Sequence, residues 1–517
     1  MKDLKILAST LFSPCLHKTS FLNQVLGVIE NNMNELQSRI TNRYKLAGQE
    51  HVLQYLPELS SSEKVTFLKE LDGINVENLS DWIESAKKEQ EQLGLNPNID
   101  QTQTQTQPQT IIEPFDQKVQ STTDTSFVKS SYEIGMKAIK EGSVCALVLA
   151  GGQGTRLGFD GPKGMYPLLL RSKSTLFQLV AERILKLQQL SGNSHTIIPW
   201  YIMTSPMNHE TTLEFFQQNR FFGLKEENVI LFSQGVLPCV DLNGKIILEN
   251  KSKCSMAPDG NGGIYTAMEK NRILEDMEKR GIQYIHAFAI DNALVKPADP
   301  VFIGCCIVEN ADCGNKVLWK RDSKEKVGIV ALKNKKPCVL EYSDMSPNLL
   351  NQVDKYGKLV YGAANICNHF YTLDFLQNVV LQNLHHMYHI AHKKIPYWNP
   401  ETNSTQTPMK NNGIKLESFI FDVFPLSKKM SIMQVCRKEE FAPVKNAPGS
   451  ANDSPDQARE MISNLAKSWV KQAGIKLRGD VDSNSCEISP LTSFGGEGID
   501  KLFENMENRV LECPFHL

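Results

Sequence analysis

The feature that most constrains this chain is the stretch Cys145–Met165, with the sequence CALVLAGGQGTRLGFDGPKGM. An aliphatic run typical of a buried strand ends there in Gly151, Gly152 and Gly154. Because glycine lacks a Cβ and reaches positive φ without a steric penalty, successive backbone N–H groups of such a loop can turn toward one anion. The stretch therefore predicts a strand that ends in a phosphate-binding loop.

Two cations follow the glycines, Arg156 and Lys163. Backbone dipoles can position phosphate oxygens, while guanidinium and ammonium groups supply full positive charge. This combination favours a polyphosphate ligand over an ordinary glycine turn.

Two common phosphate loops do not fit these residues. A Walker loop needs G-x-x-x-x-G-K-[ST], but a proline precedes Lys163 and a glycine follows it. A dinucleotide-binding fingerprint needs G-x-G-x-x-G, and counting from Gly152 the third glycine position is occupied by Leu157. A hydride-transferring oxidoreductase is therefore disfavoured.

Strand and helix patterns alternate from Val144 onward. We expect strands at 145–149, 197–203, 229–232 and 284–290, with helices at 175–190, 211–219 and 265–279. Such alternation predicts an α/β fold with a mostly parallel sheet flanked by helices, in which ligands bind beyond the carboxyl ends of the strands. The glycine loop follows one of those ends.

At 517 residues the chain is too long for one hydrophobic core. Composition changes divide it into an extension of unknown role, a helical segment with starters such as Ser60, a Gln/Thr-rich linker around QTQTQTQPQT, a catalytic domain and a C-terminal domain. The predicted bounds are 1–36, 37–93, 94–126, 127–425 and 426–517. We expect the linker to be a mobile tether or surface loop, because it has too little apolar surface to pack.

The net charge, the lengths of the apolar runs and the cysteine pattern each argue against certain classes of protein. A net charge of -2 without a basic stripe gives no support for nucleic-acid binding. No apolar run is long enough to cross a bilayer. Twelve cysteines without a CxxC pair predict reduced thiols and a cytoplasmic protein. Acidic residues are scarce as far as Glu30, so targeting to an organelle stays open.

LAGGQGTRLG followed by GPKG resembles the signature of nucleotide-sugar pyrophosphorylases, and the stretch is similar to eukaryotic UDP-N-acetylglucosamine (UDP-N-acetylhexosamine) pyrophosphorylases. The resemblance extends from about Ile40 to near the C-terminus. It implies a Rossmann-like nucleotidyltransferase fold, with a small N-terminal helical segment and a C-terminal mixed or β domain. It also implies a uridylyltransferase that makes UDP-N-acetylglucosamine and pyrophosphate from UTP and N-acetylglucosamine 1-phosphate.

The resemblance also implies residue roles. Arg156 and Lys163 would be catalytic. UTP would be bound by Leu149, Ala150, Gly151, Gly152, Lys163, Gln234, Gly260, Asp291 and Lys415. The sugar phosphate would be bound by Asn261, Glu341, Tyr342, Asn365 and Lys445.

Several of these residues also have plainer interpretations. The amide of Gln234 offers a donor and an acceptor and so suits the uracil edge. By contrast, PDGNGG at 258–263 could be only a turn and a helix cap, and VLEYS at 339–343 only a strand with one outward charge. Nothing in the sequence itself separates Lys415 or Lys445 from solvated surface lysines.

Asp291 ends the run HAFAID. A carboxylate at the carboxyl end of a strand is suited to hold Mg²⁺ (or Mn²⁺) with oxygen ligands and retained waters. Equally, an aspartate there can cap a helix or close a turn. The resemblance favours the metal or nucleotide role.

Three histidines, at positions 385, 389 and 392, have the spacing of one helical face, but no H-E-x-x-H motif is present. We therefore interpret them as a structural or solvated face.

Two further functions stay open: a UDP-glucose or broad UDP-sugar pyrophosphorylase, and a catalytically silent nucleotide-sugar-binding regulator. The choice between the N-acetylglucosamine and N-acetylgalactosamine substrates and the oligomeric state also stay open.

Overall fold

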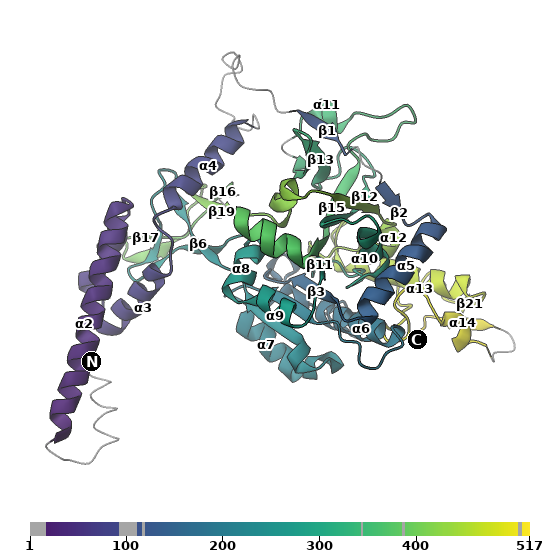
Figure 1. The fold of residues 1–517 in the computed structure, drawn as a ribbon, viewed down its shortest axis with the longest axis horizontal. Coiled ribbons are helices and arrows are strands. Elements are labelled where there is room, and N and C mark those ends of the chain that lie inside the picture. Colours follow the sequence, from purple (N-terminus) through teal and green to yellow (C-terminus); the bar gives the residue numbers. More distant parts are fainter. Residues whose placement is uncertain (1–16, 93–110, 116–118, 343–344, 385–387, 505–508) are drawn as a thin grey trace. The chain divides into compact units, whose positions relative to one another are not determined.

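The computed structural model describes residues 17–92, 111–115, 119–342, 345–384, 388–504 and 509–517 (Figure 1). The chain divides into two compact units. The first contains 1–92, 236–260 and 386–418, and the second contains 93–235, 261–385 and 419–517. All but the last residue of the predicted N-terminal helical segment, 37–93, thus falls within 1–92, the first of three separate stretches that build the first unit.

The described part of the first unit contains the α-helices α2 (His17–Leu46), α3 (Ser61–Asp72) and α4 (Leu79–Gln92). The predicted helix start at Ser60 is confirmed, because its hydroxyl accepts from the Glu63 N–H at 3.4 Å while the Glu63 carboxylate accepts from the Ser60 N–H at 2.9 Å. Side chains from all three stretches share one core, including Tyr44, Trp82 and Ile414.

Short antiparallel strands complete the first unit. They are β6 (Val236–Pro238) with β10 (Met256–Pro258), β8 (Leu248–Asn250) with β9 (Lys253–Cys254), β17 (Tyr397–Asn399) with β18 (Ser404–Gln406), and the sheet β16–β19–β7 (His389–Lys393, Gly413–Glu417, Val240–Asp241). The helical face expected for the histidines is therefore wrong, because His389 and His392 lie on β16, which pairs with β19. His385 lies outside the described residues.

The second unit is built on an eleven-stranded sheet. Its main path runs through β2 (Val119–Ser121), β20 (Met430–Gln434), β12 (Cys313–Trp319), β15 (Ala363–Thr372), β11 (Tyr284–Ala289), β3 (Val144–Leu149), β4 (Trp200–Thr204) and β5 (Val229–Ser233). Neighbours along this path are parallel, except that β15 is antiparallel to both β12 and β11. Strands β1 (Ile112–Pro114), β13 (Ile329–Lys333) and β14 (Lys336–Leu340) extend the sheet from β15. The predicted mostly parallel sheet is confirmed.

Helices cover both faces of this sheet. Alternate residues of β3 show this, since Val144, Ala146 and Val148 pack into one core while Cys145 and Leu147 pack into the other. The first core contains side chains of α5 (Thr125–Lys140), α6 (Leu176–Leu190), α10 (Pro300–Val308) and α13 (Pro455–Gln472). The second contains side chains of α8 (Ile264–Lys270) and α9 (Ile273–Lys279). A strand buried on both faces explains the unbroken aliphatic run before the glycines.

Three local expectations need correction. The single helix expected at 265–279 is two helices, because Arg272 between them has φ 55°. The tract 94–126 is not wholly a tether, since β1 and β2 lie inside it and pair with β13 and β20; residues 93–110 and 116–118 lie outside the described residues. The C-terminal part expected from residue 426 begins within the central sheet, because β20 pairs with β12.

The remaining α-helices of the described second unit are α7 (His209–Gln218), α11 (Pro347–Leu350), α12 (Arg437–Glu440) and α14 (Ile499–Leu502), and β21 (Lys476–Gly479) pairs with β22 (Val510–Cys513).

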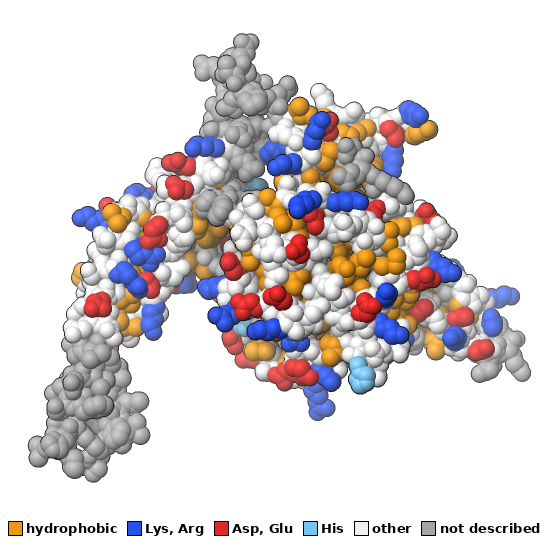
Figure 2. All heavy atoms as spheres, viewed as in Figure 1, with side chains coloured by type: hydrophobic (Ala, Val, Ile, Leu, Met, Phe, Trp, Pro, Cys, Tyr) orange, Lys and Arg blue, Asp and Glu red, His pale blue; other side chains and the backbone are white. Residues whose placement is uncertain are grey.

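The eleven cysteines of the described part are free thiols, most of them buried. Among the described helices, none combines the length and the apolar character that crossing a membrane would need. On the face drawn in Figure 2, basic and acidic side chains are interspersed.

Helices α5 and α10 lie side by side (Figure 1) and approach closely at two glycines. A Cβ at Gly304 would stand 1.8 Å from the Ser131 carbonyl oxygen, and a Cβ at Gly135 would stand 1.9 Å from that of Pro300. Both distances are far inside van der Waals contact, so the two helices can pack this closely only with glycine at these positions.

We predict that Gly304→Ala lowers the free energy of unfolding by about 2 kcal/mol, because overpacking forces the two helices apart. Urea denaturation measures this change. Glu133→Ala, at an exposed position of α5, is the control and should change stability by less than about 0.5 kcal/mol. An unchanged urea midpoint for Gly304→Ala would contradict the packing described here.

Candidate functional site

The loop that follows β3 folds back on itself. Gly154 N–H donates to the Gly161 carbonyl at 2.8 Å, and Lys163 N–H donates to the Gly152 carbonyl at 3.0 Å. A bridge between Gln153 and Pro162 lies between these two bonds. The loop is therefore closed at its base, and Lys163 stands beside the glycines that precede it by about ten positions in sequence.

The glycines of this loop have different neighbours. A Cβ at Gly151 would lie 2.6 Å from Oε1 of Gln234, so the predicted uracil-reading amide packs against the loop backbone. Gly152 is exposed, and a Cβ there would meet no atom within 4 Å, which leaves open space above its backbone. Gly164 differs, since a Cβ there would overlap the Phe177 ring at 2.2 Å. The backbone is therefore open at Gly152 and covered by Gln234 at Gly151, whereas Gly164 is needed for packing.

The start of the loop is anchored by Asn208, a residue that the sequence analysis missed. Its Nδ2 donates to the Ala150 carbonyl at 3.1 Å, and its Oδ1 accepts from the Ser205 N–H at 2.7 Å. Ala150 N–H donates to the Met203 carbonyl at 2.8 Å, and Ile290 N–H donates to the Leu149 carbonyl at 3.2 Å. The backbone groups of Leu149 and Ala150 are thus occupied by the sheet and by Asn208, which is 1% exposed.

Arg156, Lys163, Lys445 and Asp291 come together at this end of the sheet. Arg156 is exposed in the 3₁₀ turn Thr155–Leu157, and Lys163 is half-buried. Burial lowers the pKa of Lys163, the charges of Lys445 and Arg156 lower it further, and the carboxylate of Asp291 opposes them. Lys163 therefore lies within electrostatic range of two further cations and one carboxylate, an arrangement suited to a ligand with several negative charges.

Asp291 and Lys445 are connected through the backbone. Val444 N–H donates to the Asp291 carbonyl at 2.8 Å, and Asn292 forms a bridge with Pro443. Lys445 N–H donates to the Asp453 carbonyl at 2.7 Å. The segment that ends in Lys445 therefore runs directly beside the carboxyl end of β11.

The donor set can be compared with the needs of a divalent cation. Among the residues that the structure describes, no three His, Cys, Asp or Glu side chains are grouped closely enough to form a metal cage. Mg²⁺ does not require such a cage, since it binds through one or two carboxylates together with substrate phosphates and waters. The single half-buried carboxylate of Asp291 at the end of the sheet that carries the glycine loop fits that mode.

Two of the predicted sugar-binding residues flank Gly328. A Cβ at Gly328 would lie 3.4 Å from Oε1 of Glu341, and Asn365 N–H donates to the Gly328 carbonyl at 2.8 Å. Tyr342 is 39% exposed, and Nζ of Lys326 lies 6.0 Å from its ring centroid. Glu341 and Asn365 are thus brought together where β13, β14 and β15 meet.

Asn261 has a structural contact. Its Oδ1 accepts from the Ile420 N–H at 2.9 Å, which ties the turn Asn261–Gly263 to the segment that begins at Ile420. The expected helix after PDGNGG is confirmed, because α8 begins at Ile264. The proposed reading of the sugar by Asn261 stays a prediction.

Gly260 and Lys415 belong to the first unit. A Cβ at Gly260, where φ is +91°, would meet the Ser418 carbonyl oxygen at 2.2 Å, so this position requires glycine. Lys415 Nζ pairs with Glu417 Oε1 at 2.7 Å. Burial raises the pKa of the nearby Asp259 to about 7.

The family model described as UTP–glucose-1-phosphate uridylyltransferase matches residues 95–468 of the chain. The chain belongs to this family. The match contains the glycine loop, both cations that follow it, Asp291 and Lys445.

Relatives within the family cover nearly the same length. The human "UDP-N-acetylhexosamine pyrophosphorylase-like protein 1" is 40% identical, over 90% of this chain and 94% of the relative. The Saccharomyces cerevisiae "UDP-N-acetylglucosamine pyrophosphorylase" is 40% identical, over 81% of this chain and 93% of the relative. A crystal structure of the Trypanosoma brucei uridine diphosphate N-acetylglucosamine pyrophosphorylase in complex with an inhibitor superposes with a TM-score of 0.77 at 29% identity, covering 92% of this chain and 98% of that one.

We predict that Asn208→Ala loosens the glycine loop. Loss of a buried hydrogen bond costs about 1–3 kcal/mol, so the Gly154 and Lys163 amides should exchange with solvent roughly 10-fold faster. Hydrogen-exchange mass spectrometry of peptides covering 150–165 measures this. Asn219→Ala is the control, because Asn219 Nδ2 contacts only a carbonyl of the adjoining helix, that of Phe215. Equal exchange rates in the Asn208 variant and the wild type would show that Asn208 does not anchor the glycine loop.

Proposed function

We propose that this chain is a uridylyltransferase that makes UDP-N-acetylglucosamine and pyrophosphate from UTP and N-acetylglucosamine 1-phosphate. The observation that carries the proposal is the gathering of Arg156, Lys163, Lys445 and Asp291 around an open glycine backbone. The names of the human, yeast and trypanosomal relatives support the choice of an N-acetylhexosamine product over a glucose product.

The chemistry is a displacement at phosphorus. An oxygen of the sugar phosphate attacks the α-phosphorus of UTP in line, the bond from that phosphorus to the β-phosphate oxygen breaks, and pyrophosphate leaves on the opposite side. The sugar phosphate is already an anionic nucleophile, so no protein nucleophile is needed. Two unit negative charges 4 Å apart repel by about 4 kcal/mol at an effective dielectric of 20, so the barrier lies in bringing the anions together.

We assign the chain's cations to that repulsion. Arg156 and Lys163 would bind the oxygens of the α-phosphate and of the departing pyrophosphate, while backbone N–H groups at Gly151 and Gly152 orient them. Lys445 would hold the phosphate of the incoming sugar. Its place beside Asp291 supports this, because the incoming phosphate must reach the α-phosphorus from the face opposite to the leaving group.

A divalent cation, Mg²⁺ or Mn²⁺, would be held by Asp291. Held there, such an ion would supply Lewis-acid neutralisation of phosphate charge. Partial burial of Lys163 beside Asp291 lowers the local dielectric, which strengthens each charge interaction.

The two ends of the product have separate candidates. Gln234, packed on Gly151, would read the uracil edge with its amide. Glu341, Tyr342 and Asn365 would contact the hexosamine, together with Asn261. Gly260 and Lys415 are the nucleotide candidates of the first unit. A cytoplasmic location is inferred from the scattered, reduced cysteines.

A pyrophosphate-release assay tests the proposal. The protein is given UTP with N-acetylglucosamine, N-acetylgalactosamine or glucose 1-phosphate, each with and without Mg²⁺. Fastest release with an N-acetylated sugar and a requirement for the cation support the proposal. Faster release with glucose 1-phosphate would favour the UDP-glucose alternative, and no release with any sugar would favour the silent regulator.

Removal of either loop cation should slow turnover. Arg156→Ala or Lys163→Ala is predicted to lower kcat by roughly 10² or more, the scale found when one oriented donor is lost. Arg171→Ala, which removes an exposed arginine just beyond the loop, is the control and should keep wild-type turnover. Near wild-type kcat in both test variants would contradict the electrostatic assignment.

The lowered pKa of Lys163 predicts a pH dependence. Below that pKa the ammonium is charged and can bind phosphate, whereas above it the amine is neutral. The value of kcat/KM, which reports the free enzyme, should therefore fall with rising pH below the ordinary lysine value of 10.5. Lys163→Arg keeps its charge and should move this alkaline limb to higher pH. An identical limb in both proteins would show that another group controls it.

A further inference from the structure

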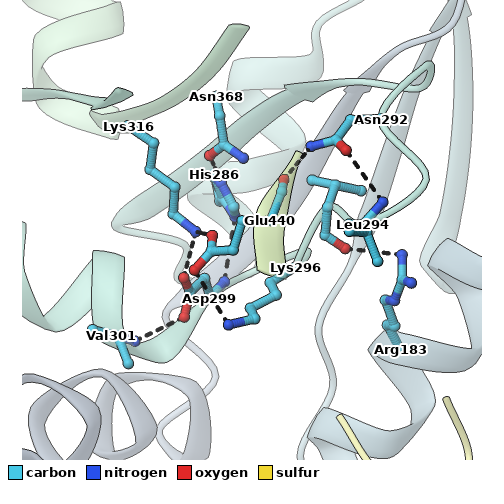
Figure 3. A network of polar contacts seen from close by, with 11 residues as sticks. Arg183, His286, Asn292, Leu294, Lys296, Asp299, Val301, Lys316, Asn368 and Glu440 are labelled. Atoms are coloured by element: carbon cyan, nitrogen blue, oxygen red, sulfur yellow. Dashed lines mark hydrogen bonds and ion pairs between the residues drawn. The ribbon is translucent and has the colours of Figure 1, made fainter. Parts of the chain in front are cut away.

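Figure 3 shows a network of ion pairs and hydrogen bonds around Glu440, Lys316, Lys296 and Asp299. Glu440, at the end of α12, is 4% exposed, and Lys316 on β12 is 0% exposed. Lys316 Nζ contacts Glu440 Oε2 at 2.6 Å and also pairs with the carboxylate of Asp299. Lys296 Nζ contacts the other Glu440 oxygen, Oε1, at 3.2 Å. Both oxygens of Glu440 are therefore held by cations.

The framework around this cluster is fixed by further hydrogen bonds. Asp299 caps α10 by accepting from the Val301 N–H at 3.0 Å, and its own N–H donates to Nδ1 of His286 at 3.3 Å. Burial, together with the charge of Lys316, lowers the pKa of His286 to about 4, so its ring is neutral. The proton on its other nitrogen then points to Oδ1 of Asn368 on β15, as Figure 3 shows. The cations that hold Glu440 thus belong to elements fixed by the central sheet.

Lys316 stands at an irregularity in its strand. The pairing of β12 with β15 shifts between Asn315 and Val317, and this β-bulge re-aims the intervening side chain. Burying the ammonium group of a lysine without charged partners would cost free energy. At this position the Lys316 ammonium instead pairs with two carboxylates, those of Asp299 and Glu440.

The segment that follows Glu440 runs to the proposed site. Asn292 Nδ2 donates to the Glu440 carbonyl at 2.7 Å, and Asn292 Oδ1 accepts from the Ala442 N–H at 2.9 Å. Two residues further, Val444 N–H reaches the Asp291 carbonyl at 2.8 Å, and Lys445 follows. Glu440 is therefore the charged end of a short strap whose other end carries the proposed sugar-phosphate cation.

Stability alone is a weak reason for such a cluster. Desolvating charges is expensive, and apolar residues of the same volume often stabilise a fold as well or better. A fully paired buried carboxylate does, however, fix the position of the backbone that carries it. Its charge is compensated only where both cations can contact its oxygens.

We propose that Glu440 is a positioning residue for the reaction: its carboxylate, held between Lys316 and Lys296, fixes the strap 440–445 so that Lys445 stands beside Asp291. This inference rests on the proposed function for the role of Lys445. Its geometric part concerns the strap itself and can be tested without turnover.

The test variant is Glu440→Gln, which keeps the shape and removes the charge. In kinetic assays the KM for N-acetylglucosamine 1-phosphate should rise roughly 10-fold or more, while the KM for UTP stays within about twofold, because only the sugar-phosphate cation is displaced. In hydrogen-exchange mass spectrometry of the protein without substrates, the peptide covering 441–446 should lose protection, since Val444 N–H no longer holds its bond to Asp291.

Three further variants separate positioning from stability. Val470→Ala removes a fully buried side chain of the C-terminal core and should lower stability without changing either KM. Lys296→Met removes one cation and leaves Lys316 on Glu440, so it should give a smaller rise in the sugar-phosphate KM even if the Glu440 variant fails to fold. Lys296→Arg keeps the charge and should behave as the wild type.

Each outcome decides a different claim. Equal changes in both KM values, or unchanged exchange at 441–446 in Glu440→Gln and Lys296→Met, would overturn the positioning role. If the wild type released no pyrophosphate, the proposed function would fail, while the exchange result would still decide whether Glu440 sets the strap.

Discussion

The parallel pairing of β3 with β11 is the constraint on which the rest of the site depends. Ala289 stands opposite Leu149, so the two strands end side by side, and their continuations are the glycine loop and Asp291. Strands buried on both faces cannot slip by one residue without turning every side chain into the wrong core. The register therefore places the start of the glycine loop and the Asp291 carboxylate through the same hydrogen-bond ladder.

The site adds charge to this frame in two layers. The outer layer consists of the exposed Arg156 and the half-buried Lys163, which follow the open backbone of Gly152 in the same loop. The inner layer is the set around Glu440, in which Glu440 and Lys316 are buried and Lys296 is half-buried, and it acts on the strap that carries Lys445. A buried charge network holds its members to a narrow range of positions, whereas exposed cations can adapt to a ligand that changes during the reaction.

Much of the fold could be predicted from sequence because its signals are local. The aliphatic run 144–149 and the glycines after it determine a buried strand and a loop whatever the rest of the chain does. The histidine segment shows the limit, since three- and four-residue spacing favoured a helix while pairing with β19 makes it a strand. The break at Arg272 likewise leaves no composition signal, because a positive φ at arginine is set by its surroundings.

The residues of the candidate site likewise fall into those that the sequence reveals and those that it does not. Its loop residues could be found from glycines and cations close together in sequence, and the later residues only from the family resemblance. Asn208 and the Asn292–Glu440 contact could not be found at all, because the partners of the latter lie 148 positions apart and neither has a distinctive motif. Polar residues that join distant segments become visible only when the backbone brings those segments together.

The most direct measurement is a crystal structure of the protein with bound UDP-N-acetylglucosamine. The diphosphate is predicted to lie against the backbone of Gly151 and Gly152, within reach of Arg156, Lys163 and Lys445. A diphosphate bound elsewhere, with the glycine loop and its cations empty, would contradict the central claim that this loop and these charges bring the two phosphates together.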